Sequence, residues 1–314
     1  MIIRYRKPGE RNIFAQTFHR MFVEAIEKAS AFTFPLIISN RYQDGSISSS
    51  LASFIILNEE GWMLTAAHII QETSLHQAHL KEYQEYIQGE ATVLNPKWIL
   101  NHSLWFGADH HWVPEFYVLP ENDLAIGKIE NFDPAFVREY PVFISPAAVK
   151  TGRSVCKLGF PFYDIQATFS GNAFRYDPGL FPIPRFPYEG MVTRIISGGT
   201  IPAGSGSLGS RAEAALPPGQ DSAPAPREIL WIETSSPGLR GQSGGPVFDK
   251  AGRVWGIQSM TRHLPLGFSP TLQKNGVTVE ENQFINLGWF AHIQAVLNFL
   301  DQHGIRYYRA EEMA

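Results

Sequence analysis

The 314-residue sequence contains a single cysteine, Cys156, so no intrachain disulfide can form. Disulfides are typical of secreted domains, and their absence favours a reducing compartment, so we expect a cytoplasmic protein. The first residues, MIIRYRKPGERN, are followed by no apolar signal-peptide segment, and no stretch approaches the ~18 apolar residues of a membrane helix. The sequence therefore predicts neither a secretion signal nor a membrane span.

The chain also lacks a large excess of positive or negative charge. The chain has 26 Lys and Arg against 30 Asp and Glu, a net charge of -4, and no long run of either sign. Nothing in this balance indicates a nucleic-acid partner or an acidic lipid surface. Hydrophobic residues make up 44% of the chain, which is enough to bury the core of one large domain or of two lobes.

What the chain does contain is a series of short β-branched and aromatic runs separated by Gly, Pro, Asn and Asp. They extend from residue 34 to about 197, resume at 228–260 and end in a strand near 285–291. Apolar side chains four residues apart predict a helix within residues 12–30 (Phe14, Phe18, Phe22, Ile26). A last helix is expected at about 291–303, with Gly304 as its stop. We predict an all-β protein with an N-terminal and a C-terminal helix.

Two stretches interrupt this pattern. Residues 71–115 are too long for a plain connection, and we expect a short helix at 74–88. In residues 198–226, 21 of the 29 positions are Gly, Ala, Ser or Pro, a composition that predicts a mobile surface loop. One hypothesis is that this loop is a passive insertion. The other, that it gates activity or is a self-cleavage site, follows only from the family resemblance described below.

Residues 241–246 read GQSGGP and carry the strongest chemical signal. A serine hydroxyl is a poor nucleophile without a neighbouring base, and the oxyanion that it generates needs hydrogen-bond donors fixed in advance. Glycines beside Ser243 allow the amides of Gly241 and Ser243 to point at one spot. The alternative interpretation is a glycine-rich turn before a hairpin, which the turn residues 249–252 predict. The first interpretation makes Ser243 a nucleophile and the amides of Gly241 and Ser243 its oxyanion hole.

Two further motifs supply partners for such a serine. His68 ends the small-residue run LTAAH, and Asp123 directly precedes an apolar strand in ENDLAI. Each has a plain alternative, a structural histidine and a strand-start aspartate. An ionised carboxylate beside an imidazole would fix its tautomer and stabilise the imidazolium. We therefore expect His68 to be a general base and Asp123 to orient it.

The order of histidine, aspartate and serine, with separations of 55 and 120 residues, resembles the trypsin/chymotrypsin superfamily. The resemblance implies two six-stranded antiparallel Greek-key barrels with the active site in the crevice between them. The expected organisation is a helical extension at 1–33, a first barrel lobe with His68 and Asp123 at 34–140 and a second lobe with Ser243 at 141–314. The boundary between the lobes is expected within 131–150.

Within the superfamily, the sequence is most similar to HtrA-type and other bacterial trypsin-like peptidases. The matching motifs are LGFP at 158–161, GMVTRIIS at 190–197, IET at 232–234 and VWGIQS at 254–259. Unlike HtrA enzymes, the chain shows no envelope signal and no C-terminal peptide-binding (PDZ) module. The resemblance implies a serine endopeptidase that forms an acyl-enzyme on a protein or peptide substrate. It needs no cofactor, and a regulatory protein partner or signal is a further expectation.

By analogy with this family, the floor of the specificity pocket lies six residues before the serine, at Pro237. One wall is formed by Ser259, Met260 and Thr261. None of these residues is acidic. We therefore predict that the P1 residue, which precedes the scissile bond, is small or apolar and not Arg or Lys.

Other features suggest weaker alternatives. His110 and His111 beside Asp109, with His102 nearby, could suggest a metal site, but adjacent strand side chains face opposite ways, and we expect no metal. His76 and His79 are expected to be solvated on a helix, and the aromatic run 181–188 to be a stiff surface loop beside the cleft.

Two rival functions follow from the same residues. GQSGG also fits the Gly-x-Ser-x-Gly elbow of esterases, but that fold requires a helix after the serine and places the acid and the histidine later in the chain. The other rival is a catalytically silent binding or scaffold protein built on a protease fold.

Overall fold

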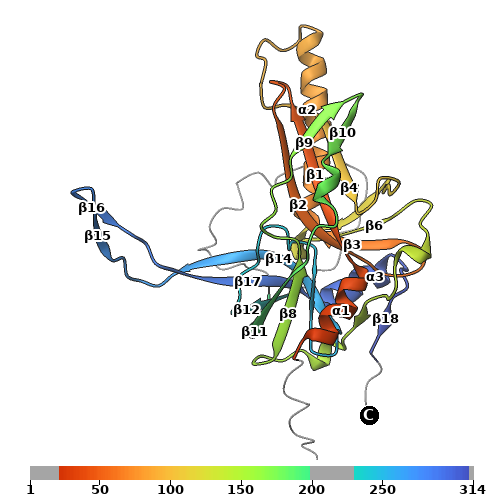
Figure 1. Ribbon diagram of the computed structural model, residues 1–314, viewed down its shortest axis with the longest axis vertical. Coiled ribbons are helices and arrows are strands. Elements are labelled where there is room, and N and C mark those ends of the chain that lie inside the picture. Colours follow the sequence, from red (N-terminus) through yellow and green to blue (C-terminus); the bar gives the residue numbers. More distant parts are fainter. Residues whose placement is uncertain (1–20, 199–229, 311–314) are drawn as a thin grey trace, which may run out of the picture.

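The computed structural model describes residues 21–198 and 230–310. Two β-sheet lobes meet at the centre of the molecule, and a thin hairpin arm extends away from them (Figure 1). Most of the segment 198–226, for which we predicted a mobile loop, lies outside the described residues. The same holds for Phe14 and Phe18 of the first predicted helix.

The first lobe is a six-stranded antiparallel sheet in the order β4-β1-β2-β3-β6-β5. Its two edge strands, β4 and β5, are not paired with each other in the described part of the chain, so the sheet is a half-barrel. Its strands are β1 (Thr33–Tyr42), β2 (Ile47–Ile56), β3 (Trp62–Ala66), β4 (Ile99–Phe106), β5 (Phe116–Leu119) and β6 (Leu124–Lys128).

The second lobe is a closed barrel, because β13 pairs with both β8 and β14 and completes the ring β13-β8-β11-β12-β17-β14. Two short strands, β7 (Val142–Phe143) and β18 (Tyr308–Arg309), extend the sheet from β14. The barrel strands are β8 (Ser154–Gly159), β11 (Phe186–Ser197), β12 (Leu230–Thr234), β13 (Pro246–Phe248), β14 (Val254–Pro265) and β17 (Phe284–His292). The predicted hairpin around residues 249–252 is confirmed as β13–β14.

Three α-helices accompany these sheets in the described residues: α1 (Val23–Phe32), α2 (Ala67–Ile87) and α3 (Ile293–Gln302). None of them is long and apolar enough to cross a membrane. The prediction of α3 is confirmed, and its apolar face is almost fully buried (Ile293, Val296, Leu297, Leu300). Each such side chain contributes roughly 1.5–3 kcal/mol of hydrophobic stabilisation. The prediction of a short helix at 74–88 was wrong in its start, because α2 already begins at Ala67.

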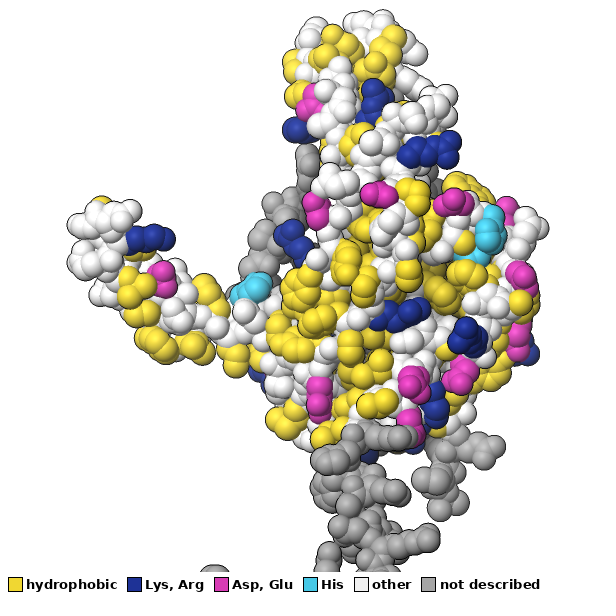
Figure 2. Space-filling model, viewed as in Figure 1, with side chains coloured by type: hydrophobic (Ala, Val, Ile, Leu, Met, Phe, Trp, Pro, Cys, Tyr) yellow, Lys and Arg dark blue, Asp and Glu magenta, His cyan; other side chains and the backbone are white. Residues whose placement is uncertain are grey.

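Two small hairpins lie outside the barrels. One is β9 (Ala167–Ser170) with β10 (Ala173–Tyr176), and the other is β15 (Thr271–Lys274) with β16 (Val277–Glu280) at the end of the arm. Figure 2 shows hydrophobic side chains in yellow along the arm. Its exposed apolar residues are Leu266, Phe268, Leu272, Val277, Val279, Phe284 and Ile285. It continues the β14–β17 ladder, which also carries residues of the predicted pocket wall.

The larger of two hydrophobic clusters in the described residues runs through both lobes and includes residues of α1 and α3. Phe54 and Phe106 meet edge to face at 5.6 Å in the first lobe, and the fully buried Trp255 and Phe290 lie in the second. The predicted architecture, a mostly β double-barrel fold of the chymotrypsin type with helices before and after it, is confirmed.

Candidate active site

Asp123 caps the start of helix α2 from a distant part of the chain. It follows the 3-10 turn Pro120–Asn122 and has a left-handed backbone, with φ of +51°. Its carbonyl oxygen accepts from the N–H of Ala67 at 3.0 Å, and its Oδ1 accepts from the N–H of His68 at 2.8 Å. The first N–H groups of a helix have no partner within the helix. Asp123 thus satisfies two of them and ties the end of β3 to the start of β6.

The same carboxylate binds the imidazole of His68. Asp123 Oδ2 lies 2.8 Å from His68 Nδ1 and also accepts a hydrogen bond from the hydroxyl of Ser259. Burial lowers the pKa of His68, but the hydrogen bond and charge of Asp123 and the charge of Glu72 outweigh it, so the pKa is raised above its ordinary value. The side chain of His68 remains 35% exposed, which leaves the ring accessible from one side.

Glu72, one helical turn after His68, was not identified from the sequence as part of this site. Its Oε2 accepts a hydrogen bond from Asn40 Nδ2 at 2.5 Å, and Asn40 in turn lies 2.7 Å from His102 Nδ1. The spacing of four residues places Glu72 and His68 on the same face of α2. A second carboxylate therefore contributes to the electrostatics around the imidazole.

The serine loop lies between β12 and β13 and is pressed against the first lobe. The N–H of Ser53 donates to the carbonyl of Ser243 at 2.8 Å, and the hydroxyl of Ser53 donates to the carbonyl of Gly241 at 2.7 Å. Gly244 has φ of +84°, and a Cβ there would lie 2.1 Å from the carbonyl oxygen of Ser53. Glycine is required at 244 because the two lobes touch there backbone to backbone.

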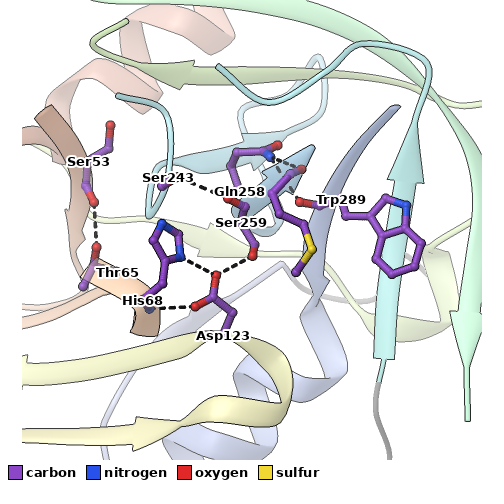
Figure 3. Close-up of polar contacts among 9 residues, drawn as sticks. Ser53, Thr65, His68, Asp123, Ser243, Gln258, Ser259 and Trp289 are labelled. Carbon is purple, nitrogen blue, oxygen red and sulfur yellow. Dashed lines mark hydrogen bonds and ion pairs between the residues drawn. The ribbon is translucent and has the colours of Figure 1, made fainter. Parts of the chain in front are cut away.

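The hydroxyl of Ser243 lies beside His68 but donates to the carbonyl of Ser259, at 3.1 Å (Figure 3). Within the described residues it makes no hydrogen bond to the imidazole. The amides of Gly241 and Ser243 have no acceptor among the residues that the structure describes. The structure thus brings His68, Asp123 and Ser243 together and leaves both predicted oxyanion donors unpaired.

The residues of the predicted pocket are also brought together, although their contacts differ from a simple floor and wall. Thr261 Oγ1 donates to the carbonyl of Gly238 at 2.6 Å, beside the half-buried Pro237. Met260 is half-buried, and its carbonyl accepts from Gln258 Nε2. Ser259 was expected to line the pocket, but its hydroxyl contacts Asp123. Its contact partner is 136 residues away, so no local pattern could have identified it.

The remaining histidines meet only in pairs within the described residues, His76 with His102 and His110 with His111. His102 binds Asn40 and Thr73, while His111 Nδ1 lies 2.7 Å from the carbonyl of Phe106. No group of three potential metal ligands is found in ranges 21–198 and 230–310. The expectation that His76 and His79 are solvated was wrong, because both are half-buried beside β4.

The aromatic run 181–188 was expected to be a surface loop, and this expectation is corrected in part. Its last three residues begin β11, and Ile183 is buried in a small second core with Phe160. The strand forms because residues 186–191 pair with β8 in the closed barrel. The other residues of the run therefore form a connection that is anchored at both ends.

Three comparisons relate the chain to known proteins. A search of curated protein sequences finds no match. Among solved structures, the chain is similar to the Rv3671c protease from M. tuberculosis in its active form, at 12% identity and a TM-score of 0.46. That match covers 98% of this chain and 96% of the other chain. It is also similar to the HtrA-type protease AlgW with a tripeptide, at 16% identity and a TM-score of 0.44. That match covers 90% of this chain and 64% of the length of AlgW.

The sequence profile of the trypsin-like peptidase domain matches residues 52–257. This range is roughly two thirds of the chain and contains His68, Asp123 and Ser243. The chain belongs to the trypsin-like peptidase family.

Proposed function

We propose that this protein is a serine endopeptidase in which Ser243 is the nucleophile, His68 the general base and Asp123 the group that orients the base. The observation that supports this most is the bond of 2.8 Å between His68 Nδ1 and Asp123 Oδ2, with Ser243 on the other side of the ring (Figure 3). A hydrogen bond at Nδ1 fixes the tautomer in which Nε2 is unprotonated and can accept a proton.

In this proposal, the hydroxyl oxygen of Ser243 attacks the carbonyl carbon of the scissile bond while its proton passes to His68 Nε2. The new oxyanion accepts hydrogen bonds from the free amides of Gly241 and Ser243. The tetrahedral intermediate then breaks its C–N bond, and the leaving amine takes the proton from Nε2. Water repeats the sequence on the acyl-enzyme, which releases the second product and restores the hydroxyl.

The hydrogen bond from Ser243 to the carbonyl of Ser259 corresponds to a resting orientation of the nucleophile. Rotation about the Cα–Cβ bond of Ser243 would release the hydroxyl from Ser259 and turn it towards His68. A partner protein or signal that favours the rotated state would raise activity. The exposed apolar arm is a candidate contact for such a partner, because it leads directly into the β14–β17 ladder.

A catalytically silent binding protein is the second candidate function, and the same bond between Ser243 and Ser259 favours it. In that case the hydroxyl stays with Ser259 under all conditions, and the arm serves only as a contact surface. The two candidates differ in one respect that can be measured, which is turnover.

Cleavage of a denatured protein substrate tests the proposal. Wild type should produce peptide fragments, Ser243→Ala and His68→Ala should produce none, and Ser74→Ala, an exposed serine on α2, should behave as wild type. Fragments that persist in Ser243→Ala would contradict the proposal. No cleavage by any form, with or without candidate partners, would favour the silent protein.

We also propose that the protein functions in the cytoplasm. The single thiol, Cys156, is buried and free, and burial raises its pKa to about 12. A fold without a disulfide does not depend on an oxidising compartment. Fractionation of cells that produce the full chain should recover it with cytoplasmic markers, and recovery in the periplasm or medium would contradict this assignment.

A further inference from the structure

Lys157 is a buried cation that the steps above do not use. It lies on β8, and its side chain is 0% exposed. Its Nζ donates to the carbonyl of Ser236 at 2.6 Å and to the carbonyl of Pro237 at 3.2 Å. Within the described residues no carboxylate forms an ion pair with it, and burial lowers the pKa of the amine to about 7.

An ammonium in such a place opposes folding. Removing a charge from water without a counter-charge is costly, and lysine is among the residues that are least often fully buried. Packing considerations alone would favour a methionine or leucine inside a closed barrel. Residues that break a local rule of stability without compensation often belong to a functional site.

The position of Nζ indicates which site this is. One of its two acceptors is the carbonyl of Pro237, the predicted floor of the specificity pocket. Gly288 lies directly beside Nζ and beside the other acceptor, because a Cβ there would come within 2.1 Å of Nζ and 2.5 Å of the Ser236 carbonyl oxygen. Gly288 pairs across the ladder with Thr261 of the predicted wall. The amine therefore lies against the predicted floor and beside the strand that pairs with the predicted wall.

We infer that Lys157 makes this pocket selective for an acidic P1 residue, and for Glu before Asp because Nζ lies at the floor. This inference rests on the proposed endopeptidase function. An ammonium has three N–H donors, and the carbonyls of Ser236 and Pro237 use two of them. A P1 carboxylate would accept the third bond and supply the missing counter-charge. This replaces the expectation of a small or apolar P1 residue.

The amine is not exposed in the free protein, because Lys157 is fully buried. Thr261 Oγ1 donates to the carbonyl of Gly238, and Gln258 Nε2 donates to the carbonyls of Met260 and Trp289, each at 3.1 Å (Figure 3). In this proposal, the bond between Thr261 and Gly238 opens when a P1 side chain enters towards Nζ. Thr261→Val, which removes the hydroxyl and keeps the shape, should therefore raise kcat/KM for Glu substrates and leave their preference unchanged.

The test compares matched peptides that differ only at P1, with Glu, Gln, Asp, Leu or Lys. Glu and Gln have the same shape, so their ratio of kcat/KM isolates the charge. A hydrogen bond to a charged group predicts that wild type favours Glu over Gln by roughly tenfold to hundredfold. In Lys157→Met the ratio should fall to about one or below, and in the control Lys128→Met, an exposed lysine, it should equal that of wild type.

Labelling by a fluorophosphonate is measured in parallel, so that failure of the acidic P1 preference can be distinguished from failure of the proposed endopeptidase function. Labelled wild type that shows no preference for Glu would overturn this inference alone, and an unlabelled protein would overturn the proposed function with it. Preference for Gln over Glu would also overturn it and would point to Gln258 Oε1, which has no donor in the described structure. If Lys157→Met fails to fold, product peptides ending in Glu or Gln are compared on Ser243→Ala, where tighter binding of the Glu peptide is expected and equal binding refutes the inference.

Discussion

Replacement of Gly244 by alanine tests how the serine loop is held. The residue has φ of +84°, and left-handed backbone costs an alanine about 1–2 kcal/mol. In addition, the new Cβ would lie 2.1 Å from the carbonyl oxygen of Ser53 and 2.2 Å from Thr65 Oγ1, so the loop must move by about 1 Å. Such a shift weakens two hydrogen bonds, from the N–H of Ser53 to the carbonyl of Ser243 and from the N–H of Gly244 to the carbonyl of Gln258. Each is 2.8 Å long and contributes about 1 kcal/mol to stability. The expected total loss of unfolding free energy is about 3–4 kcal/mol.

Gly152→Ala is the matched control, because its φ is +80° and an added Cβ meets nothing within 4 Å. It should lose only the backbone part, about 1–2 kcal/mol. Urea unfolding measures both variants, and the rate of fluorophosphonate labelling measures the displacement of Ser243, for which about a hundredfold loss is expected in Gly244→Ala alone. Equal unfolding free energies for the two variants, together with normal labelling of Gly244→Ala, would refute the close contact between the lobes.

Three further predictions concern charged groups. Asp123→Asn should keep the fold and lower kcat by about 10⁴-fold in a peptide cleavage assay, because the imidazole is left in the wrong tautomer. A near-normal kcat would mean that another group orients His68. The pKa of His68 is raised, so labelling should be lost as the pH falls through a value above 6.5, and Glu72→Gln should move this midpoint to lower pH in a pH–rate profile. The pKa of Lys157 is about 7 in the folded protein and 10.5 ordinarily. Between pH 7 and pH 10.5 the unfolded chain therefore binds more protons than the folded protein, and the free energy of unfolding rises with pH. Lys157→Met should therefore stabilise the protein by up to about 5 kcal/mol below pH 7, with the gain shrinking towards pH 10.5 in urea titrations.

The features that sequence patterns could predict are those with local causes. The apolar face of α3, the turn between β13 and β14 and the glycines around Ser243 each follow from neighbouring residues. The motifs around His68, Asp123 and Ser243, together with their order in the chain, led to the expectation that they meet through the resemblance to the trypsin/chymotrypsin superfamily. The role of each in catalysis stays a prediction until activity is measured.

The features that could not be predicted depend on contacts between distant residues. Helix α2 begins at Ala67 without a Ser, Thr, Asp or Asn as N-cap, because Asp123 supplies the cap from 55 residues away. The amine of Lys157 reaches the pocket floor through a carbonyl 80 positions later in the chain. The first lobe remains a half-barrel because β4 pairs only with β1 and its outer edge finds no partner strand in the described residues.

The central claim is that Ser243 is a nucleophile activated by His68. Intact-mass analysis after treatment with a fluorophosphonate tests it most directly, with peptide mapping to locate the adduct. One adduct, on Ser243, is expected in folded wild type, and none is expected in Ser243→Ala or His68→Ala. An adduct on another residue, or one on Ser243 that forms equally fast in His68→Ala, would contradict it.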